Sequence, residues 1–126
     1  MELLCPNTEF SVCTVRDYSM VDLDAEYCFI GKTPEEKSLV CAAEAVPSNV
    51  LAREDGWKCL KISGVLDFGL VGILSKLTGV LANCGIPVFA VSTFMTDYIF
   101  VKKENFQKAL EALKTAGYEI NTRSEK

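Results

Sequence analysis

The second half of the chain alternates apolar and polar positions in a way that predicts its secondary structure. Residues 57–63 alternate between the two classes and stop before Gly64, which is typical of a strand. Apolar residues then recur at helical spacing, which predicts a helix with Asp67 as its N-cap and Gly85 as its stop. The apolar stripe of this helix consists of Leu70, Leu74, Leu77, Leu81 and Cys84.

Two further strands and a second helix are expected downstream. Residues 86–92 and 98–101 are rich in β-branched and aromatic side chains, which favours strands. A second helix opens at Glu104 and ends at Gly117, and residues 118–121 form a last short strand. The resulting order, β-α-β-β-α-β, predicts an α+β protein with the ferredoxin-like arrangement.

The first half of the chain has weaker patterns. Strands are expected at residues 10–15, 27–31 and 38–43, followed by a short helix at 47–51 and a short closing strand at 52–53. This order resembles a degenerate second copy of the same topology with its first helix reduced. We therefore predict two lobes.

The expected division is a β-rich N-terminal lobe at residues 1–55 and a complete βαββαβ domain at 56–126. The predicted strands at 86–91 and 98–101 are apolar on both alternating sets of positions. Because helices cover one face of such a sheet, something must also cover the other face. This predicts either tight pairing of the two lobes or a homodimer.

Composition excludes several classes of protein. The chain has 126 residues, of which 49% are hydrophobic and 24% charged, as in ordinary folded domains. The formal net charge is −4 and no basic cluster follows a helix face, so we expect no nucleic-acid partner. No apolar stretch is long enough to cross a membrane and no secretion signal is visible, so we expect a cytoplasmic protein.

Candidate catalytic and metal-binding chemistry is sparse. The six cysteines form no CxxC pair and the chain has no histidine, so we expect buried free thiols, no metal and no cofactor. Without histidine there is no ordinary catalytic triad, and no close pair of carboxylates is evident. We therefore expect no enzyme. An enzyme that uses a reactive thiol is the remaining catalytic alternative.

The start of the first predicted helix is a candidate binding site. Backbone amides there, from about Phe68 to Gly72, point outward at the positive end of the helix dipole. Gly69 and Gly72 permit close approach of a carboxylate or phosphate. The alternative is that Asp67 merely caps its own helix and the glycines allow close packing of the helix against the sheet.

A second candidate cluster contains Ser92, Thr93, Thr96 and Asp97. In a ferredoxin-like fold this cluster lies near the start of the first helix. Asp97 would bind an ammonium or guanidinium group, and Thr93 would donate or accept a hydrogen bond. The alternative is an ordinary hairpin turn, in which these residue types are common.

Two segments also resemble a known family. The stretch WKCLKISGVLDFGLVGIL and the stretch NCGIPVFAVSTFMTDYIFVKKENFQKALEAL are similar to small ACT-domain proteins, with a looser resemblance over residues 9–51. The branch is related to the ACT lobes of the cytosolic arginine sensors called CASTOR proteins. The resemblance implies a regulatory, non-catalytic fold that binds an amino acid between two lobes.

The resemblance also implies which residues bind the ligand. Gly64 and the loop residues Leu66, Asp67, Phe68 and Gly69 would receive the ligand's backbone end. Lining the pocket would be Thr93, Phe94 and Asp97. Many relatives carry polar residues where this chain has Gly69, Val71 and Met95, so arginine specificity is not assumed and an apolar ligand side chain is favoured.

The expected function is therefore a dimeric sensor domain for a small amino acid or similar metabolite. The alternative is a protein-interaction or dimerisation module whose ligand site has decayed.

Overall fold

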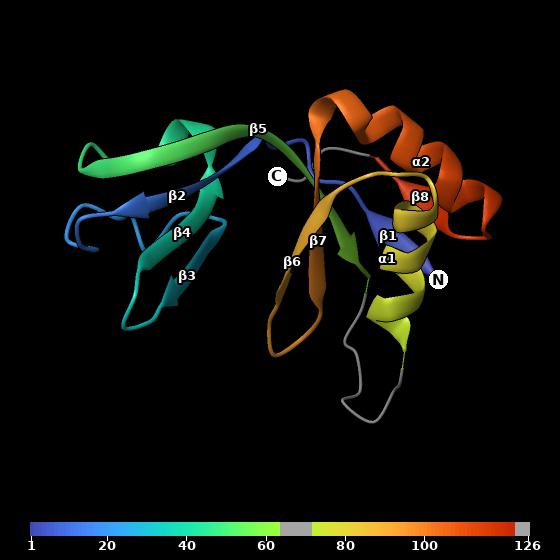
Figure 1. Ribbon diagram of the computed structural model, residues 1–126, viewed down its shortest axis with the longest axis horizontal. Helices are drawn as coiled ribbons and strands as arrows, with labels where there is room; N and C mark the ends of the chain where they lie inside the picture. Colours follow the sequence, from blue (N-terminus) through green and yellow to red (C-terminus); the bar gives the residue numbers. More distant parts are fainter. Residues whose placement is uncertain (64–71, 123–126) are drawn as a thin grey trace. The chain divides into compact units, whose positions relative to one another are not determined.

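The computed structural model describes residues 1–63 and 72–122 (Figure 1). The chain forms two compact units, which we call the N-terminal unit, Thr8–Trp57, and the C-terminal unit, Met1–Asn7 with the described part of Lys58–Lys126. The expected division after residue 55 lies two residues before the observed one. The first seven residues, which we expected in the N-terminal lobe, pack in the C-terminal unit.

The C-terminal unit has the mixed α+β architecture predicted from the sequence. From the end of β5 onward the order of major elements is strand, helix, strand, strand, helix, strand, which confirms the βαββαβ expectation. Its elements are β1 (Glu2–Leu4), the end of β5 (Val50–Ile62), α1 (Ile73–Asn83), β6 (Val88–Ser92), β7 (Asp97–Lys102), η2 (Lys103–Asn105), α2 (Phe106–Thr115) and β8 (Glu119–Asn121).

Strand β1 was not predicted, yet it is an interior strand of the sheet. It pairs antiparallel with β5, where Leu3 lies opposite Ile62. On its other side it pairs parallel with β8, where Leu3 lies opposite Ile120. Strand β7 pairs with β5 and with β6, which completes the sheet of this unit. Three residues are too few to show a period-2 pattern, so no strand could be predicted here.

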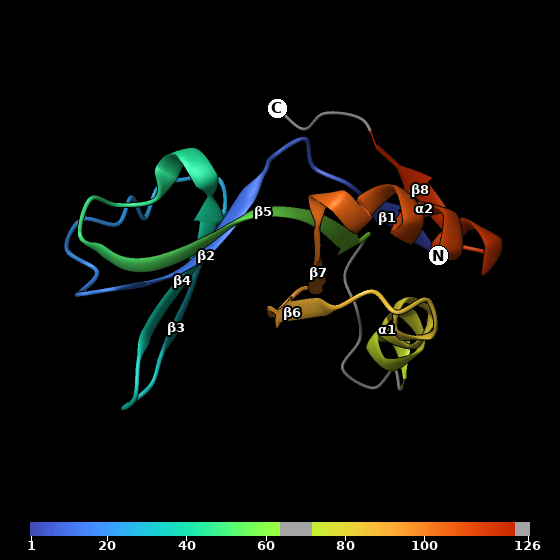
Figure 2. The same ribbon diagram turned by 45° about the horizontal axis from the view of Figure 1, so that its top comes forward.

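The core of the C-terminal unit lies between this sheet and the two helices. Both helices lie on one side of β6 and β7 (Figures 1 and 2). Leu77 and Leu81 of α1, Leu113 of α2, and Ile99 and Val101 of β7 are fully buried in one apolar cluster. Because Ile99 and Val101 are two residues apart, the same alternate set of β7 faces the helices.

Helix α1 starts later than the sequence predicted. Its N-cap is Gly72, in the left-handed region at φ 81°, and the amide of Lys76 donates to the Gly72 carbonyl at 2.8 Å. The expected cap at Asp67 lies outside the described residues, and the described helix has Gly72 in that position. Gly72 can make the turn into α1 because glycine adopts positive φ at no steric cost. The predicted stop at Gly85, with φ 71°, is confirmed.

The N-terminal unit is a four-stranded antiparallel sheet in the order β3-β4-β2-β5. The predicted strands are confirmed within one or two residues. The elements are β2 (Phe10–Val15), β3 (Cys28–Lys32), β4 (Lys37–Ala42), η1 (Ala43–Ala45) and the first part of β5. The expected helix at 47–51 is wrong, because the helical turn is η1 and Val50 already belongs to β5.

Strand β5 is also one element where two were expected. Its 13 residues include the closing strand predicted at 52–53 and all but the last residue of the strand predicted at 57–63. Asp55 and Gly56 together lie opposite Ser11, since the register passes from Phe10↔Trp57 to Val12↔Glu54. This is a β-bulge, and Gly56 has the positive φ (87°) that such bulges favour. Gly56 is thus part of a bulge inside one continuous strand.

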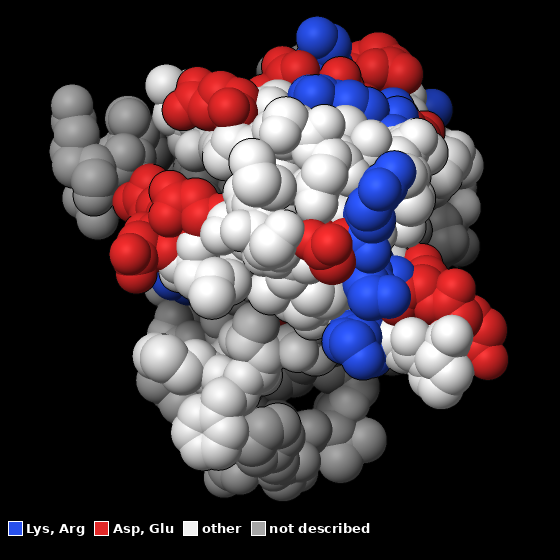
Figure 3. Space-filling view, turned by 90° about the vertical axis from the view of Figure 1, so that its left-hand side faces the viewer, with Lys and Arg blue, Asp and Glu red and all other residues white. Residues whose placement is uncertain are grey.

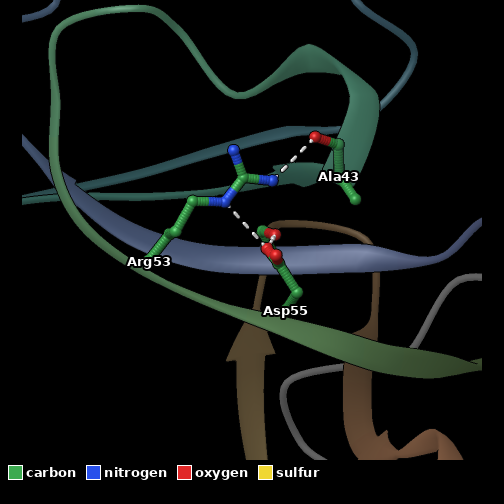
Figure 4. A network of polar contacts seen from close by, with 4 residues as sticks. Ala43, Arg53 and Asp55 are labelled. Atoms are coloured by element: carbon green, nitrogen blue, oxygen red, sulfur yellow. Dashed lines mark hydrogen bonds and ion pairs between the residues drawn. The ribbon is translucent and has the colours of Figure 1, made fainter.

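A polar network stabilises the backbone at this bulge (Figure 4). The hydroxyl of Ser11, which is fully buried, donates to the Asp55 carboxylate. The Arg53 guanidinium forms an ion pair with the same carboxylate at 3.0 Å and donates to the Ala43 carbonyl at 3.2 Å. The buried Ser11 hydroxyl therefore has a hydrogen-bond partner. The bond from Arg53 to Ala43 also connects η1 to β5.

Charge of both signs is distributed over the surface. In the view of Figure 3, acidic side chains form several groups, and basic side chains form a stripe down the right-hand part of the face among uncharged residues. This face therefore carries charge of both signs. Among the helices of the described residues, none is both long and apolar enough to cross a membrane.

Candidate functional site

The candidate site lies at one end of the C-terminal unit, where the end of β5 and the turn between β6 and β7 lie side by side (Figure 1). Strand β5 ends at Ile62, helix α1 begins at Ile73, and the turn between β6 and β7 occupies residues 93–96. The loop that joins β5 to α1 carries five of the eight predicted ligand-binding residues. Those five lie outside the described residues: Gly64, Leu66, Asp67, Phe68 and Gly69.

The turn between β6 and β7 is closed by hydrogen bonds between Thr93 and Thr96. Both the amide and the hydroxyl of Thr93 donate to the Thr96 carbonyl at 2.9 Å. The amide of Thr96 donates back to the Thr93 hydroxyl at 3.4 Å. The hydroxyl of Thr93 therefore donates within the turn, as the hairpin alternative predicts. Its oxygen can still accept a hydrogen bond.

Thr96 connects this turn to the end of β5. Its hydroxyl donates to the carbonyl of Ile62 at 2.8 Å, and the side chain is 3% exposed. The hydrogen bond therefore holds the hairpin turn against the end of β5. The sequence placed Thr96 in the candidate cluster but did not assign it a role. The sequence pattern that could have indicated this role is a hydroxyl at the last position of a turn between two apolar strands.

We expect Thr96→Val to lower the free energy of unfolding by about 1–2 kcal/mol, because the buried Ile62 carbonyl loses its donor while the shape is kept. Urea denaturation of the pure protein measures this. Thr78→Val is the matched control. The Thr78 hydroxyl donates to the Leu74 carbonyl within α1, so its loss costs less. Equal effects of the two substitutions would contradict the role given to Thr96.

Asp97 presents an acid at the same end of the unit. It is the first residue of β7 and shares the helix-covered face with Ile99 and Val101. Within residues 1–63 and 72–122, its carboxylate has no hydrogen-bond or ion-pair partner. The predicted acid is therefore available to a cation.

The tip of the turn is apolar and faces solvent. Phe94 is 82% exposed and Met95 is 55% exposed. In the described part of the chain Phe94 therefore does not line an enclosed cavity. A cavity of about 220 Å³ does lie beside the start of α1, but other residues line it. They are Met1, Ile73, Lys76, Ala116, Gly117 and Tyr118.

Two chemical features of the site region follow from the described residues. Burial raises the pKa of the Tyr118 hydroxyl in the cavity beside α1, so this group stays protonated at neutral pH. Within residues 1–63 and 72–122, no metal ion could be held by a group of three or more side chains of histidine, cysteine, aspartate or glutamate.

Comparison with known proteins agrees with this architecture. The family model described as an ACT domain matches residues 52–115. No curated protein matches significantly. Among solved structures, protein Atu0741 from Agobacterium tumefaciens superposes with a TM-score of 0.87 at 26% identity, covering 98% of this chain and 94% of that one. Protein VC0802 from Vibrio cholerae gives 0.65 at 26% identity, covering 88% and 85%.

A more distant structure shares the fold. The regulatory subunit of aspartate kinase from Thermus thermophilus superposes with a TM-score of 0.60 at 11% identity, covering 90% of this chain and 94% of that one. The segment matched by the family model spans more than half of the 126 residues and includes both helices and the hairpin turn. The chain therefore belongs to the ACT-domain family.

Proposed function

We propose that this protein is a non-catalytic regulatory protein that binds a small amino acid or a similar metabolite at the end of the C-terminal unit. The observation that carries the proposal is the hydrogen bond from Thr96 to Ile62. This bond holds the hairpin turn against the end of β5. Next to it lies the unpaired carboxylate of Asp97. Membership of the ACT-domain family and the likeness to a kinase regulatory subunit support a regulatory role.

The proposed site matches the two charges of an amino acid. The Asp97 carboxylate receives the ammonium group through a charge-assisted hydrogen bond. Backbone groups of Gly64 and of the residues from Leu66 to Gly69 receive the carboxylate. Thr93 and Phe94 complete the site from the turn, where the Thr93 oxygen accepts a hydrogen bond and the exposed Phe94 ring covers an apolar ligand side chain.

The proposal also includes the location, the assembly and the family relationship of the protein. We propose that the protein is cytoplasmic, that it assembles as a homodimer, and that it is related to the ACT lobes of the CASTOR proteins. Ligand binding changes the association of the protein with its target, since a ligand shifts an equilibrium only by its difference in affinity for the two states. Sedimentation with and without ligand measures the assembly.

The test is a thermal-shift screen against the twenty common amino acids. A ligand at a hundred times its dissociation constant stabilises the folded protein by about 2.7 kcal/mol, which raises the melting temperature by several degrees. We expect Asp97→Asn to abolish most of the shift, because the neutral amide loses the attraction for the ammonium group. Glu111→Gln, on the exposed face of α2, is the control and should leave the shift unchanged.

A shift that survives Asp97→Asn would contradict the role of this carboxylate. Absence of a shift with any amino acid, while the oligomer stays intact, would favour the second candidate function, a protein-interaction or dimerisation module with a decayed site. The observation behind that candidate is the turn itself. It uses the amide and the hydroxyl hydrogen of Thr93, and it leaves Phe94 and Met95 exposed.

A further inference from the structure

Three of the six cysteines lie together in the core of the N-terminal unit. Cys41 is on the central strand β4, with Cys28 on β3 to one side and Cys13 on β2 to the other. Cys13 and Cys41 belong to one buried apolar cluster, and Cys28 packs against it. The three thiols therefore face the same side of the sheet.

Cys28 and Cys41 are directly opposite each other in the antiparallel pair of β3 and β4. At the turn that joins these strands, Thr33 and Glu36 exchange both backbone hydrogen bonds, at 3.0 and 3.4 Å. Hydrogen-bonded and non-hydrogen-bonded pairs alternate along an antiparallel ladder. Counting from Thr33↔Glu36, the pair Cys28↔Cys41 is the fifth step along the register and is therefore non-hydrogen-bonded.

This kind of pair brings the two side chains closest. Opposed residues in a non-hydrogen-bonded pair have α-carbons about 4.5 Å apart, within the range of about 4.4–6.8 Å that a disulfide spans. The backbone at Cys28 and Cys41 thus already has a spacing that a disulfide needs.

Cys13 is not directly opposite Cys41. The residue opposite Cys41 on β2 is Ser11, and Cys13 is opposite Leu39, so Cys13 and Cys41 are diagonal neighbours. Both belong to the same buried apolar cluster. Diagonal residues have α-carbons about 7–8 Å apart, beyond the usual span of a disulfide. Cys28 is therefore the better partner for Cys41.

The two thiols of the opposed pair differ in access. Cys41 is 3% exposed, whereas Cys28 is half-buried on β3, which pairs with β4 alone among the described strands. A small reagent reaches Cys28 first. In this arrangement the accessible cysteine reacts with the reagent first, and the buried neighbour then resolves the mixed disulfide.

We propose that Cys28 and Cys41 are a thiol pair that forms a reversible disulfide across β3 and β4 by exchange with a small-molecule disulfide such as oxidised glutathione. The Cys28 thiolate attacks one sulfur of the reagent, forms a mixed disulfide and releases one reagent thiolate. The Cys41 thiolate then attacks the Cys28 sulfur and releases the second. Two protein thiols are oxidised, one reagent disulfide is reduced, and the two cysteine protons end on the two released thiols.

Burial sets the rate of this exchange. Loss of contact with water raises the pKa of the Cys28 thiol and raises that of Cys41 to about 11, with nearby thiols and Asp22 adding to the effect. Because the thiolate is the reacting species, each pH unit below these values costs about tenfold in its concentration. We expect the rate of oxidation to rise steadily from neutral pH to pH 9 without reaching a plateau.

The experiment is oxidation of the full chain under native conditions, followed by alkylation in denaturant and mass spectrometry. Formation of the disulfide leaves four alkylated cysteines instead of six and removes two hydrogen atoms from the mass. Trypsin then separates the candidates. Residues 17–32 contain Cys28 alone and residues 38–53 contain Cys41 alone, whereas Cys13 lies in residues 1–16 together with Cys5.

We expect a cross-linked species of peptides 17–32 and 38–53 that a reductant separates. Cys28→Ser should abolish it, whereas the control Cys84→Ser, which alters a half-buried thiol in the other unit, should leave it unchanged. Circular dichroism of both variants checks that they fold.

Three results would overturn the proposal. One is a cross-link that contains peptide 1–16. Another is a mixed disulfide that persists on Cys28 without closure. The third is a native protein that stays fully reduced under conditions that oxidise the denatured chain. Because the pair lies in the N-terminal unit, none of these results depends on amino-acid binding at the other unit.

Discussion

In a Leu3→Ala variant the free energy of unfolding is expected to fall by about 2–5 kcal/mol, the usual cost of truncating a fully buried leucine. Leu3 is 0% exposed and belongs to the same apolar cluster as the helices of the C-terminal unit. It lies on β1 between β5 and β8, so the cavity would open in the middle of the sheet. Chemical denaturation with urea measures the loss.

Leu51→Ala is the matched control for this experiment. Leu51 is a leucine in a strand, but it is 63% exposed, and its truncation should change stability by less than about 0.5 kcal/mol. If Leu3→Ala cost no more than Leu51→Ala, the first strand would not be part of the core in solution.

Stability is also expected to fall at alkaline pH, by about 2–4 kcal/mol in total between pH 9 and 11. Burial raises the pKa of the Cys5 and Cys41 thiols from 9.0 to about 11. The charges of Lys58 and Lys114 partly oppose the shift at Cys5. In this window the unfolded chain ionises these thiols and the folded chain keeps them neutral, so the folded state holds more protons.

The sign of the effect follows from that difference. A folded-state pKa above the unfolded value stabilises the fold fully below pH 9, and the contribution is lost as pH rises through about 11. A full shift would be worth about 2.7 kcal/mol for each thiol. We expect less because water screens charge close to the surface of so small a protein.

Urea denaturation in the presence of a reductant, repeated at intervals across this range, measures the dependence. Cys5→Ala and Cys41→Ala should each flatten the curve, because each removes one titrating group. A curve with the same slope in both variants and in the parent chain would show that other groups, such as lysines and tyrosines, cause the alkaline loss.

Local patterns in the sequence determined the order of elements from the end of β5 to β8. Alternation up to Ser63, the helical spacing from Leu74 to Leu81, and the stops at Gly85 and Gly117 each depend on contacts between near neighbours. Such signals are visible without the rest of the molecule because the periods of strand and helix are local. The same holds for the acid at Asp97 and the turn at Thr93.

Contacts between distant residues decided the rest. Strand β1 exists because Leu3 is buried between Ile62 and Ile120, which are far away in the chain. The bulge at Gly56 depends on its partner Ser11, which lies on another strand. At the candidate site, the sequence supplied a hydroxyl at Thr96, but its role depends on the Ile62 carbonyl 34 positions earlier. Such partners cannot be predicted from periodicity in the sequence, because each pair is defined by a single long-range hydrogen bond or packing contact.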